Sequence, residues 1–264
     1  TWQSLAQQLR EAPTLSHHVV GPLLSRLACL ADLSRAATGS AERFASIASD
    51  TQRWQLGECS FALLEQPLAL RAVLLRVLGC ESQLRAHLLL QAQLARRAGR
   101  VQAALDALYQ LREVDASQMP SLRELCEQAR VLWKQGESER ALRLVQHQLN
   151  ALDGEPLSAA ADQQSLREAY CLAGRWVSRT RSESSVVVRE QYLKRATALA
   201  QRSGADGGRA WFALARHLDQ QHEQLRQMLS SPEWTASQRL RYSRQRQLAA
   251  VRERLESGAS ELSA

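Results

Sequence analysis

LARRAGRVQAALDAL, residues 94–108, returns 37 positions further along the chain as VLWKQGESERALRLV, residues 131–145. In each copy an apolar helical pattern meets a glycine, and a second helix then opens with an Ala-Leu pair. A period of roughly 34–40 residues built from two helices is typical of an α-solenoid. The two copies therefore predict antiparallel helix hairpins that stack one upon the next.

Small residues and tryptophans are the predicted packing anchors of these hairpins. Gly99 and Gly136 align at the turn, and Ala104 and Ala141 align in the second helix. A small side chain at the alanine positions lets the second helix approach its partner closely. Larger anchors between helices are predicted at four tryptophans: Trp133, Trp176, Trp211 and Trp234.

Composition predicts an almost entirely helical protein. The 264 residues include only 12 Gly and 6 Pro, while Leu, Ala, Arg, Gln and Glu, all good helix formers, dominate. We expect N-terminal helices in residues 1–50 and a repeat array in residues 51–264. Within the array, tetratricopeptide-like hairpins are predicted at about residues 80–205 and a final long hairpin at about residues 208–257.

Two further expectations concern the C-terminal half. Gly174 lies 38 positions after Gly136 and predicts a third copy of the repeat, in which Arg175 and Trp176 continue the helix beyond the glycine. The last helix is expected to turn its apolar side chains inward: Leu240, Leu248, Val251 and Leu255.

Composition also indicates the compartment and the kinds of partner that we expect for the protein. No run of eighteen apolar residues is present, so no membrane span is expected. The five cysteines lie far apart without a Cys-x-x-Cys pair, which favours reduced thiols in the cytoplasm or nucleus over disulfides or zinc. The net charge of +7 comes almost wholly from arginine, since Lys134 and Lys194 are the only lysines. Such a charge permits contact with nucleic acid or an acidic partner.

Several strings resemble the FAT region of the ATM-type kinases, which are PI3-kinase-related serine/threonine kinases of the DNA-damage response. The resemblance covers roughly residues 55–255 as many modest matches in the same order and with similar spacing. The matching strings are FALLEQPLALRAVLL at residues 61–75, ARVLWKQGESERAL at 129–142, QYLKRA at 191–196, ALARHLD at 213–219 and MLSSPEW at 228–234.

The resemblance implies a regulatory scaffold without catalytic residues of its own. In this family the FAT region clamps the kinase domain of the same chain, supports homodimer formation and relays contacts from other protein regulators. It also implies a nuclear location and a kinase domain further along a longer parent protein, which would bind ATP and magnesium. No cofactor is expected within this segment.

The residues themselves support no catalytic or metal site. A kinase needs a catalytic-loop Asp, a metal-binding Asp and a nucleotide-binding Lys, and no such arrangement occurs. His17 and His18 are adjacent and diverge on a helix, while His217 and His222 are five apart, which places neither pair on one face. The Gly-rich loop at residues 203–208 lacks the order of a phosphate-binding loop.

A basic surface is the remaining candidate site. Arginines crowd the last helix at Arg239, Arg241, Arg244 and Arg246. They could contact DNA or an acidic partner, but a solvated helix face is the favoured interpretation, so direct nucleic acid binding is not favoured. Four Ser/Thr-Gln dipeptides, which ATM-type kinases modify as a family, begin at Thr51, Ser82, Ser117 and Ser237.

The alternative hypothesis is a stand-alone tetratricopeptide-type adaptor that binds a peptide or small effector in its concave groove. A PI3-kinase-like catalytic domain downstream in the parent gene would favour the kinase scaffold. A DNA-binding or transferase domain there would favour the adaptor.

Overall fold

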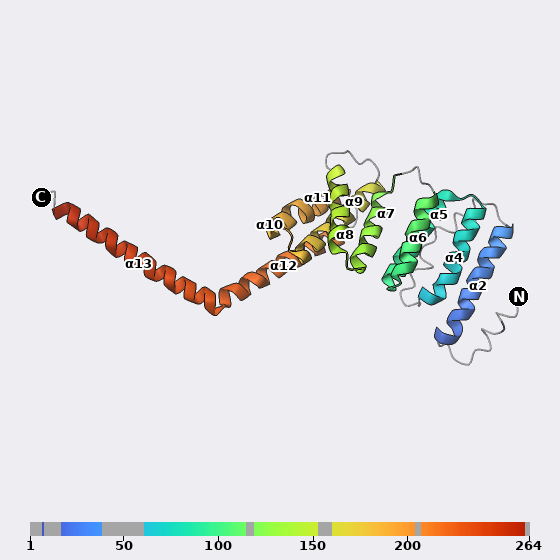
Figure 1. The fold of residues 1–264 in the computed structure, drawn as a ribbon, viewed down its shortest axis with the longest axis horizontal. Helices are drawn as coiled ribbons and strands as arrows, with labels where there is room; N and C mark the ends of the chain where they lie inside the picture. Colours follow the sequence, from blue (N-terminus) through green and yellow to red (C-terminus); the bar gives the residue numbers. More distant parts are fainter. Residues whose placement is uncertain are drawn as a thin grey trace. The chain divides into compact units, whose positions relative to one another are not determined.

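The computed structural model describes residue 7 and residues 17–38, 61–114, 119–152, 160–203 and 207–261. They are helical apart from short turns, and no strand occurs among them (Figure 1). The chain divides into two compact units, residues 1–169 and 170–264. The all-α prediction is therefore confirmed, while the predicted boundary at residue 50 lies outside the described residues.

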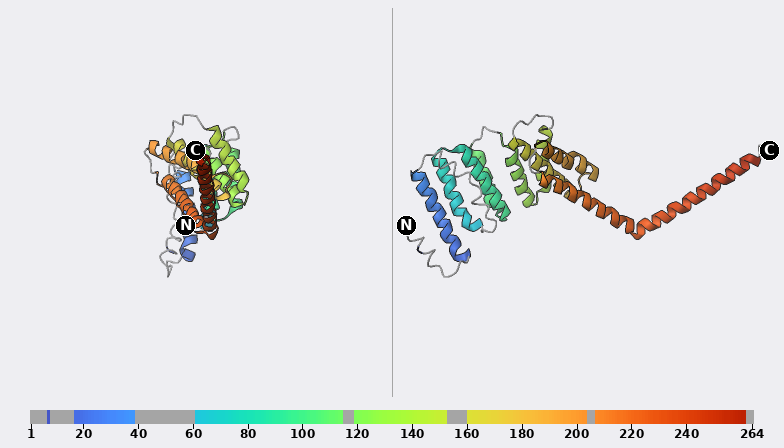
Figure 2. Two further views of the ribbon diagram at one scale, coloured as in Figure 1. Left: turned by 90° about the vertical axis from the view of Figure 1, so that its left-hand side faces the viewer. Right: turned by 180° about the vertical axis from the view of Figure 1, so that it is seen from behind.

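The first unit is a run of helices in which each packs on the next along the chain (Figure 2). The main contacts are those of α2 with α4, α4 with α5, α5 with α6, α6 with α7, and α7 with α8. This order of contacts is solenoid-like, as predicted. The helices are α2 (His17–Thr38), α4 (Phe61–Val77), α5 (Glu81–Arg97), α6 (Val101–Val114), α7 (Leu122–Lys134) and α8 (Ser138–Ala151).

Glycine ends α5 and α7 in the same way. Gly99 has φ +76° and Gly136 has φ +92°, which lie in the left-handed region that residues with a Cβ rarely adopt. After α5, Gly99 N–H donates to the Arg96 carbonyl over 3.1 Å and Arg100 N–H to the Ala95 carbonyl over 2.8 Å. This pair of bonds is a Schellman motif, which satisfies carbonyls left free at a helix end. The same two bonds recur around Gly136 and around Gly79, whose φ is +67°.

Small and branched apolar side chains fill the core between these helices. Ala104 and Ala141, at matching positions of the two hairpins, have no exposed surface. One cluster extends from α4 to α7 and contains Phe61, Leu68, Ala72, Leu75, Leu84, Leu88, Leu89, Leu90, Ala92, Ala95, Ala104, Ala107, Leu108, Leu111 and Val131.

The second unit begins within α9 (Ala160–Thr180). It continues through α10 (Ser185–Val187), a π-helical segment η2 (Val188–Leu193) and α11 (Lys194–Ser203), and ends with α12 (Gly208–Ser230) and α13 (Pro232–Glu261). The segments α10, η2 and α11 form one helical run, in which Val188, Tyr192 and Leu193 are buried.

Gly174 does not end a helix, and Arg175 and Trp176 continue α9 beyond it as expected, so this position differs from the glycine turns at Gly99 and Gly136. It lies inside α9 and is absent from the glycines with positive φ. A Cβ at this position would lie 2.8 Å from Leu193 Cδ2, which is closer than van der Waals contact. The absence of a side chain at Gly174 therefore allows η2 to pack closely against α9.

The apolar side chains of the last helix are exposed, which contradicts the expectation that they face inward. Leu240, Leu248, Val251 and Leu255 keep 53–70% of their surface accessible, and Leu225 and Met228 on α12 are also exposed. Helical periodicity identifies an apolar face but does not supply the surface that covers it. The main contacts of α13 are with α12.

The turn glycines predict a conformational effect that can be separated from packing. A Cβ at Gly99 would meet no atom within 4 Å, so Gly99→Ala should cost about 1 kcal/mol of unfolding free energy through left-handed backbone strain alone. Gly99→Asn should cost less, because Asn tolerates this conformation better. Urea unfolding followed by circular dichroism measures both. Equal losses for Ala and Asn would contradict the conformational explanation.

Candidate functional site

A fully buried carboxylate links helices of the first unit. Glu127 on α7 has no exposed surface. It accepts hydrogen bonds from Arg96 Nε on α5 and from Arg130 Nη1 on its own helix, the latter over 3.1 Å. Arg130 Nη2 also lies 3.5 Å from Glu168 Oε2 on α9. Charges of alternating sign therefore connect α5, α7 and α9.

Sequence reasoning missed Glu127. It lies beside the buried Cys126 and two residues before the buried Ala129. An acidic residue within an apolar helical stripe was the available signal, but its partner Arg96 is 31 residues away in the chain. Burying this carboxylate is favourable only because two guanidinium groups contact it.

A second carboxylate, that of Glu124, caps the N-terminus of α7 and also binds the adjacent helix α5. Ser121 Oγ accepts a hydrogen bond from the Glu124 N–H, and Glu124 Oε2 accepts one from the Ser121 N–H, which makes a capping box at the start of α7. Both oxygens of Glu124 also accept hydrogen bonds from Arg85 Nη2 on α5, each over 3.0 Å. The start of α7 is thereby held to α5.

Buried polar groups also lie between α2, α4 and α5. Asp32 on α2 is 3% exposed, and its Oδ2 lies 3.7 Å from Nε of the fully buried Arg71 on α4. His87 on α5 is 3% exposed, and its Nε2 lies 2.8 Å from the Leu68 carbonyl on α4. Because a carbonyl only accepts, Nε2 carries the hydrogen.

The environment of His87 disfavours its charged form. Burial lowers the pKa of His87 to about 4, the Leu68 carbonyl opposes this shift, and Arg71 adds to it. The other ring nitrogen, Nδ1, is buried and has no hydrogen-bond partner among the described residues. Protonation would therefore place an unsatisfied N–H and a positive charge in this interior.

A separate polar cluster joins elements of the second unit. His217 on α12 is buried, with Nδ1 3.4 Å from Ser178 Oγ on α9 and Nε2 3.3 Å from the Ser185 carbonyl at the start of α10. Tyr192 on η2 donates to Glu183 Oε1 over 3.1 Å. These hydrogen bonds connect α9, α10 and α12.

The described histidines considered above for a metal site differ in burial. His217 is buried and His222 is exposed. The side chains of His17 and His18 lie outside the described set. Over the described ranges, no group of three His, Cys, Asp or Glu side chains could hold a metal ion.

No disulfide joins the cysteines that the structure describes. They are Cys29, Cys80, Cys126 and Cys171. Burial raises the pKa of the Cys126 thiol to about 11, so this group stays protonated near neutral pH. In the same ranges, none of the helices is apolar over a length that would cross a membrane.

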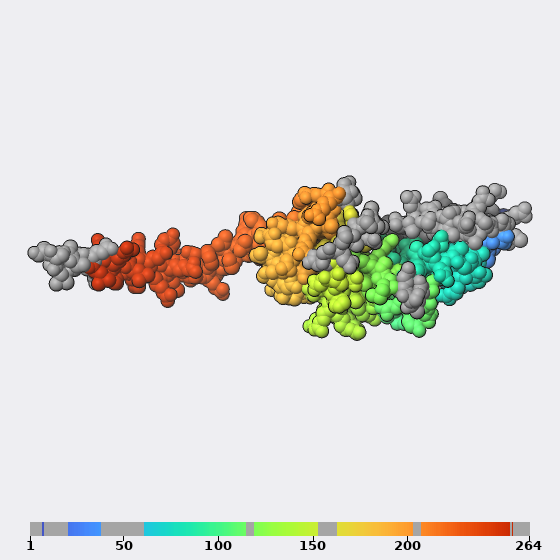
Figure 3. All heavy atoms as spheres, turned by 90° about the horizontal axis from the view of Figure 1, so that it is seen from above, coloured from blue at the N-terminus to red at the C-terminus, as the bar shows by residue number. Residues whose placement is uncertain are grey.

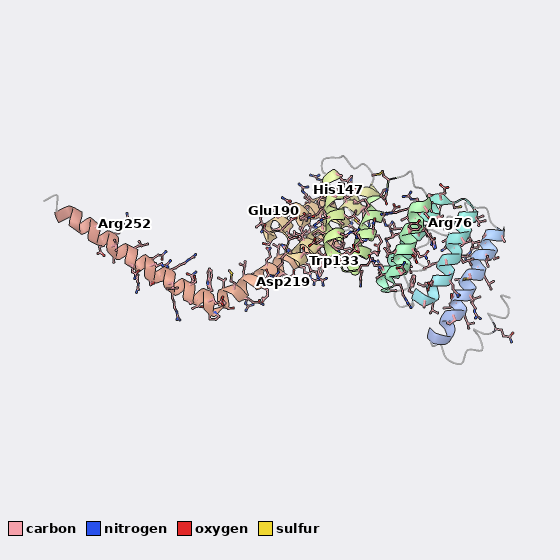
Figure 4. All side chains as sticks on the ribbon, viewed as in Figure 1. Arg76, Trp133, His147, Glu190, Asp219 and Arg252 are labelled. Atoms are coloured by element: carbon pink, nitrogen blue, oxygen red, sulfur yellow. The ribbon has the colours of Figure 1, made fainter. Side chains whose placement is uncertain are left out.

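The predicted tryptophan anchors differ in burial. Trp176 on α9 is buried, while Trp133, near the end of α7, and Trp234 are half-buried (Figure 4). Trp211 keeps 47% of its surface exposed, although one edge lies close to Gly207, where a Cβ would be 3.3 Å from its Cδ1. The anchor roles of Trp133 and Trp211, like those of Gly99, Ala104, Gly136 and Ala141, stay predictions.

The predicted basic surface lies on α13, the red C-terminal helix of Figure 3, and its arginines 239, 241, 244 and 246 are exposed. Arg239 and Arg246 are seven residues apart and share one face of the helix, while Arg241 and Arg244 lie on another. Of the Ser/Thr-Gln positions, Ser82 and Ser237 are exposed, and Thr51 and Ser117 lie outside the described residues.

The charge network of Glu127 predicts a large loss of stability when its charge is removed. Glu127→Gln leaves the partly buried Arg96 without the carboxylate that contacts it and Arg130 with Glu168 alone, and it should cost about 3 kcal/mol of unfolding free energy. The matched control is Glu139→Gln, because its pair with Arg143 is mostly exposed, and it should cause no measurable change. Urea unfolding compares the two, and equal stability of both variants would contradict this role.

His87 predicts a pH dependence of stability. Its pKa is about 4 when folded and 6.5 in an ordinary setting, so the unfolded chain takes up the proton first as pH falls. The contribution of His87 to the free energy of unfolding is fully present above about pH 6.5. It falls by about 3 kcal/mol in total as the pH is lowered to about 4. His87→Gln should remove this slope, whereas His147→Gln, at an exposed site on α8, should keep it (Figure 4). Unfolding curves from pH 7.5 down to 4.5 give the measurement.

Comparison with known proteins identifies the family. The family model described as FAT domain matches residues 2–254. The serine/threonine-protein kinase ATM of Arabidopsis thaliana is 30% identical over 208 residues, covering 74% of this chain and 5% of the plant protein. The serine-protein kinase ATM of Sus scrofa is 24% identical over 266 aligned residues, covering 88% of this chain and 8% of the pig protein. The chain thus spans less than a tenth of these relatives, and it belongs to the FAT domain family.

Proposed function

We propose that this chain is the regulatory scaffold of an ATM-type serine/threonine kinase that acts in DNA-damage signalling in the nucleus. The match to the FAT domain family over residues 2–254 carries the proposal, and both relatives are named ATM kinases. ATP and magnesium then belong to a kinase domain elsewhere in the parent protein, and this segment transfers no phosphate. The same family match favours the scaffold over a stand-alone adaptor.

The contacts of the first unit support a mechanical role. Its buried ionic groups, Glu127, Arg71 and Asp32, pair with charged groups of the same unit. The ion pairs between helices and the left-handed glycine turns fix how successive helices are placed against each other. A stiff helical array can favour one arrangement of a kinase domain over another if it contacts the two arrangements differently.

Clamping of the kinase domain and support of a homodimer are the finer parts of the proposal. A clamp acts by holding a neighbouring domain, so its loss should change the rate of phosphate transfer without changing how ATP is bound. Weakening the first unit separates these two effects.

The test uses the full-length parent kinase. Glu127→Gln should lower kcat on a Ser-Gln peptide as temperature rises through the weakened unit's unfolding, with KM for ATP unchanged, because the nucleotide site lies in another domain. Glu139→Gln should match the wild type. Sedimentation of the same proteins reports on the dimer. Phosphate transfer by residues 1–264 alone, or unchanged kcat and dimerisation in an unfolded Glu127→Gln segment, would overturn the proposal.

A further inference from the structure

One face of α13 has the spacing of a coiled-coil seam. Five side chains follow one another at alternating steps of three and four residues: Arg241, Arg244, Leu248, Val251 and Leu255. This spacing corresponds to the a and d positions of successive heptads, which lie along one side of a helix. Leu248, Val251 and Leu255 are 70%, 53% and 69% exposed. The three apolar side chains thus form an uncovered stripe.

The surface of this stripe is hollowed where a partner side chain would insert. Arg244, Gln247, Leu248 and Val251 line a shallow pocket. Their spacing is i, i+3, i+4 and i+7, which is the four-residue hole that receives one knob of a facing helix in a coiled coil. Both halves of the packing geometry, an exposed seam and a hole of the right residues, therefore occur at one place.

Charge restricts what can pair with this seam. Between Glu233 and Glu253 the helix carries five arginines, at 239, 241, 244, 246 and 252, and no acidic residue. Arg241 and Arg244 occupy seam positions at one end, and the three apolar residues occupy the other. A second copy aligned in parallel would place Arg241 and Arg244 against themselves, which is unfavourable.

We propose that α13 is a docking surface for an acidic amphipathic helix, which forms a two-stranded coiled coil with it. The partner presents Leu-type side chains to Leu248, Val251 and Leu255, one of them in the hollow. It presents Asp or Glu side chains to Arg241 and Arg244. The mixed seam fixes both the register and the direction of the partner, because only one alignment pairs acids with the arginines and apolar residues with the stripe. The inference concerns the surface of α13 and does not depend on the proposed kinase scaffold.

The helix supplies its own matched control. Arg239 and Arg246 take the f position of the same heptads, on the side opposite the seam. Reversing these two charges alters the net charge of α13 as much as reversing Arg241 and Arg244. A coiled-coil partner distinguishes the two pairs, whereas a diffuse attraction between opposite charges does not.

The probe is a designed helical peptide of about 28 residues, or four heptads, with Leu at the a and d positions of one half and Glu at those of the other. It is made in both orders, for parallel and antiparallel pairing, and a basic version carries Lys in place of every Glu. Fluorescence anisotropy with the whole chain, at about 0.15 M salt so that distant charges are screened, gives the affinities.

One order of the acidic peptide should bind at least about ten-fold more tightly than its basic version. Arg241→Glu with Arg244→Glu should weaken acidic-peptide binding about ten-fold and allow the basic peptide to bind. Arg239→Glu with Arg246→Glu should change either affinity by less than about three-fold. Leu248→Ser with Val251→Ser should weaken both peptides, and circular dichroism checks that every variant remains helical.

Three results would overturn the proposal. The first is no preference for the acidic peptide in either order. The second is an equal effect of the two arginine pairs, which would mean that binding is diffuse. The third is self-association of the chain in sedimentation that Leu248→Ser with Val251→Ser abolishes and the peptide cannot displace, which would assign the seam to a second copy.

Discussion

Burial of the Glu127 carboxylate is the constraint on which the first unit depends. A charge without exposed surface requires opposite charges at hydrogen-bond distance, and Arg96 and Arg130 supply them from α5 and α7. Since these groups must meet, α5 and α7 cannot slide past each other without breaking the contact. Arg85 and Glu124 fix the same two helices at a second point. Apolar packing supplies the bulk of the core, and the ionic contacts make one register favourable.

The repeat could be predicted from local sequence signals, whereas the charged pairs between residues far apart in the chain could not. Gly99 and Gly136 are visible in the sequence because a left-handed turn selects glycine within a few residues of each helix end. Glu127 could be noticed as an acid among apolar neighbours, yet nothing local indicates that Arg96 is its partner. His87 and Arg71 are similar cases, because their buried state depends on α4 packing against α5 and α2.

Gly174 and the last helix show two further limits of prediction from sequence. Glycine serves both positive φ and close approach, and spacing alone cannot tell which applies; at Gly174 it is close approach to Leu193. A periodic apolar face predicts an amphipathic helix, as α13 is. The pattern does not tell whether another part of the same chain covers that face. The candidate basic surface was visible as a group of arginines, and helical spacing alone places Arg239 and Arg246 on a different face from Arg241 and Arg244.

The π-helical segment has a consequence for relatives of different length. Residues 188–193 follow i→i+5 hydrogen bonding, so this turn holds one residue more than an α-helical turn. Such a turn takes up the extra residue locally, and Val188, Tyr192 and Leu193 within it are buried. A homologue lacking a single amino acid at this point could revert to ordinary helix while Ala196 and Ala200 kept their buried orientation. The segment is therefore the place in this helix where evolution can remove one residue without turning the outer face inward.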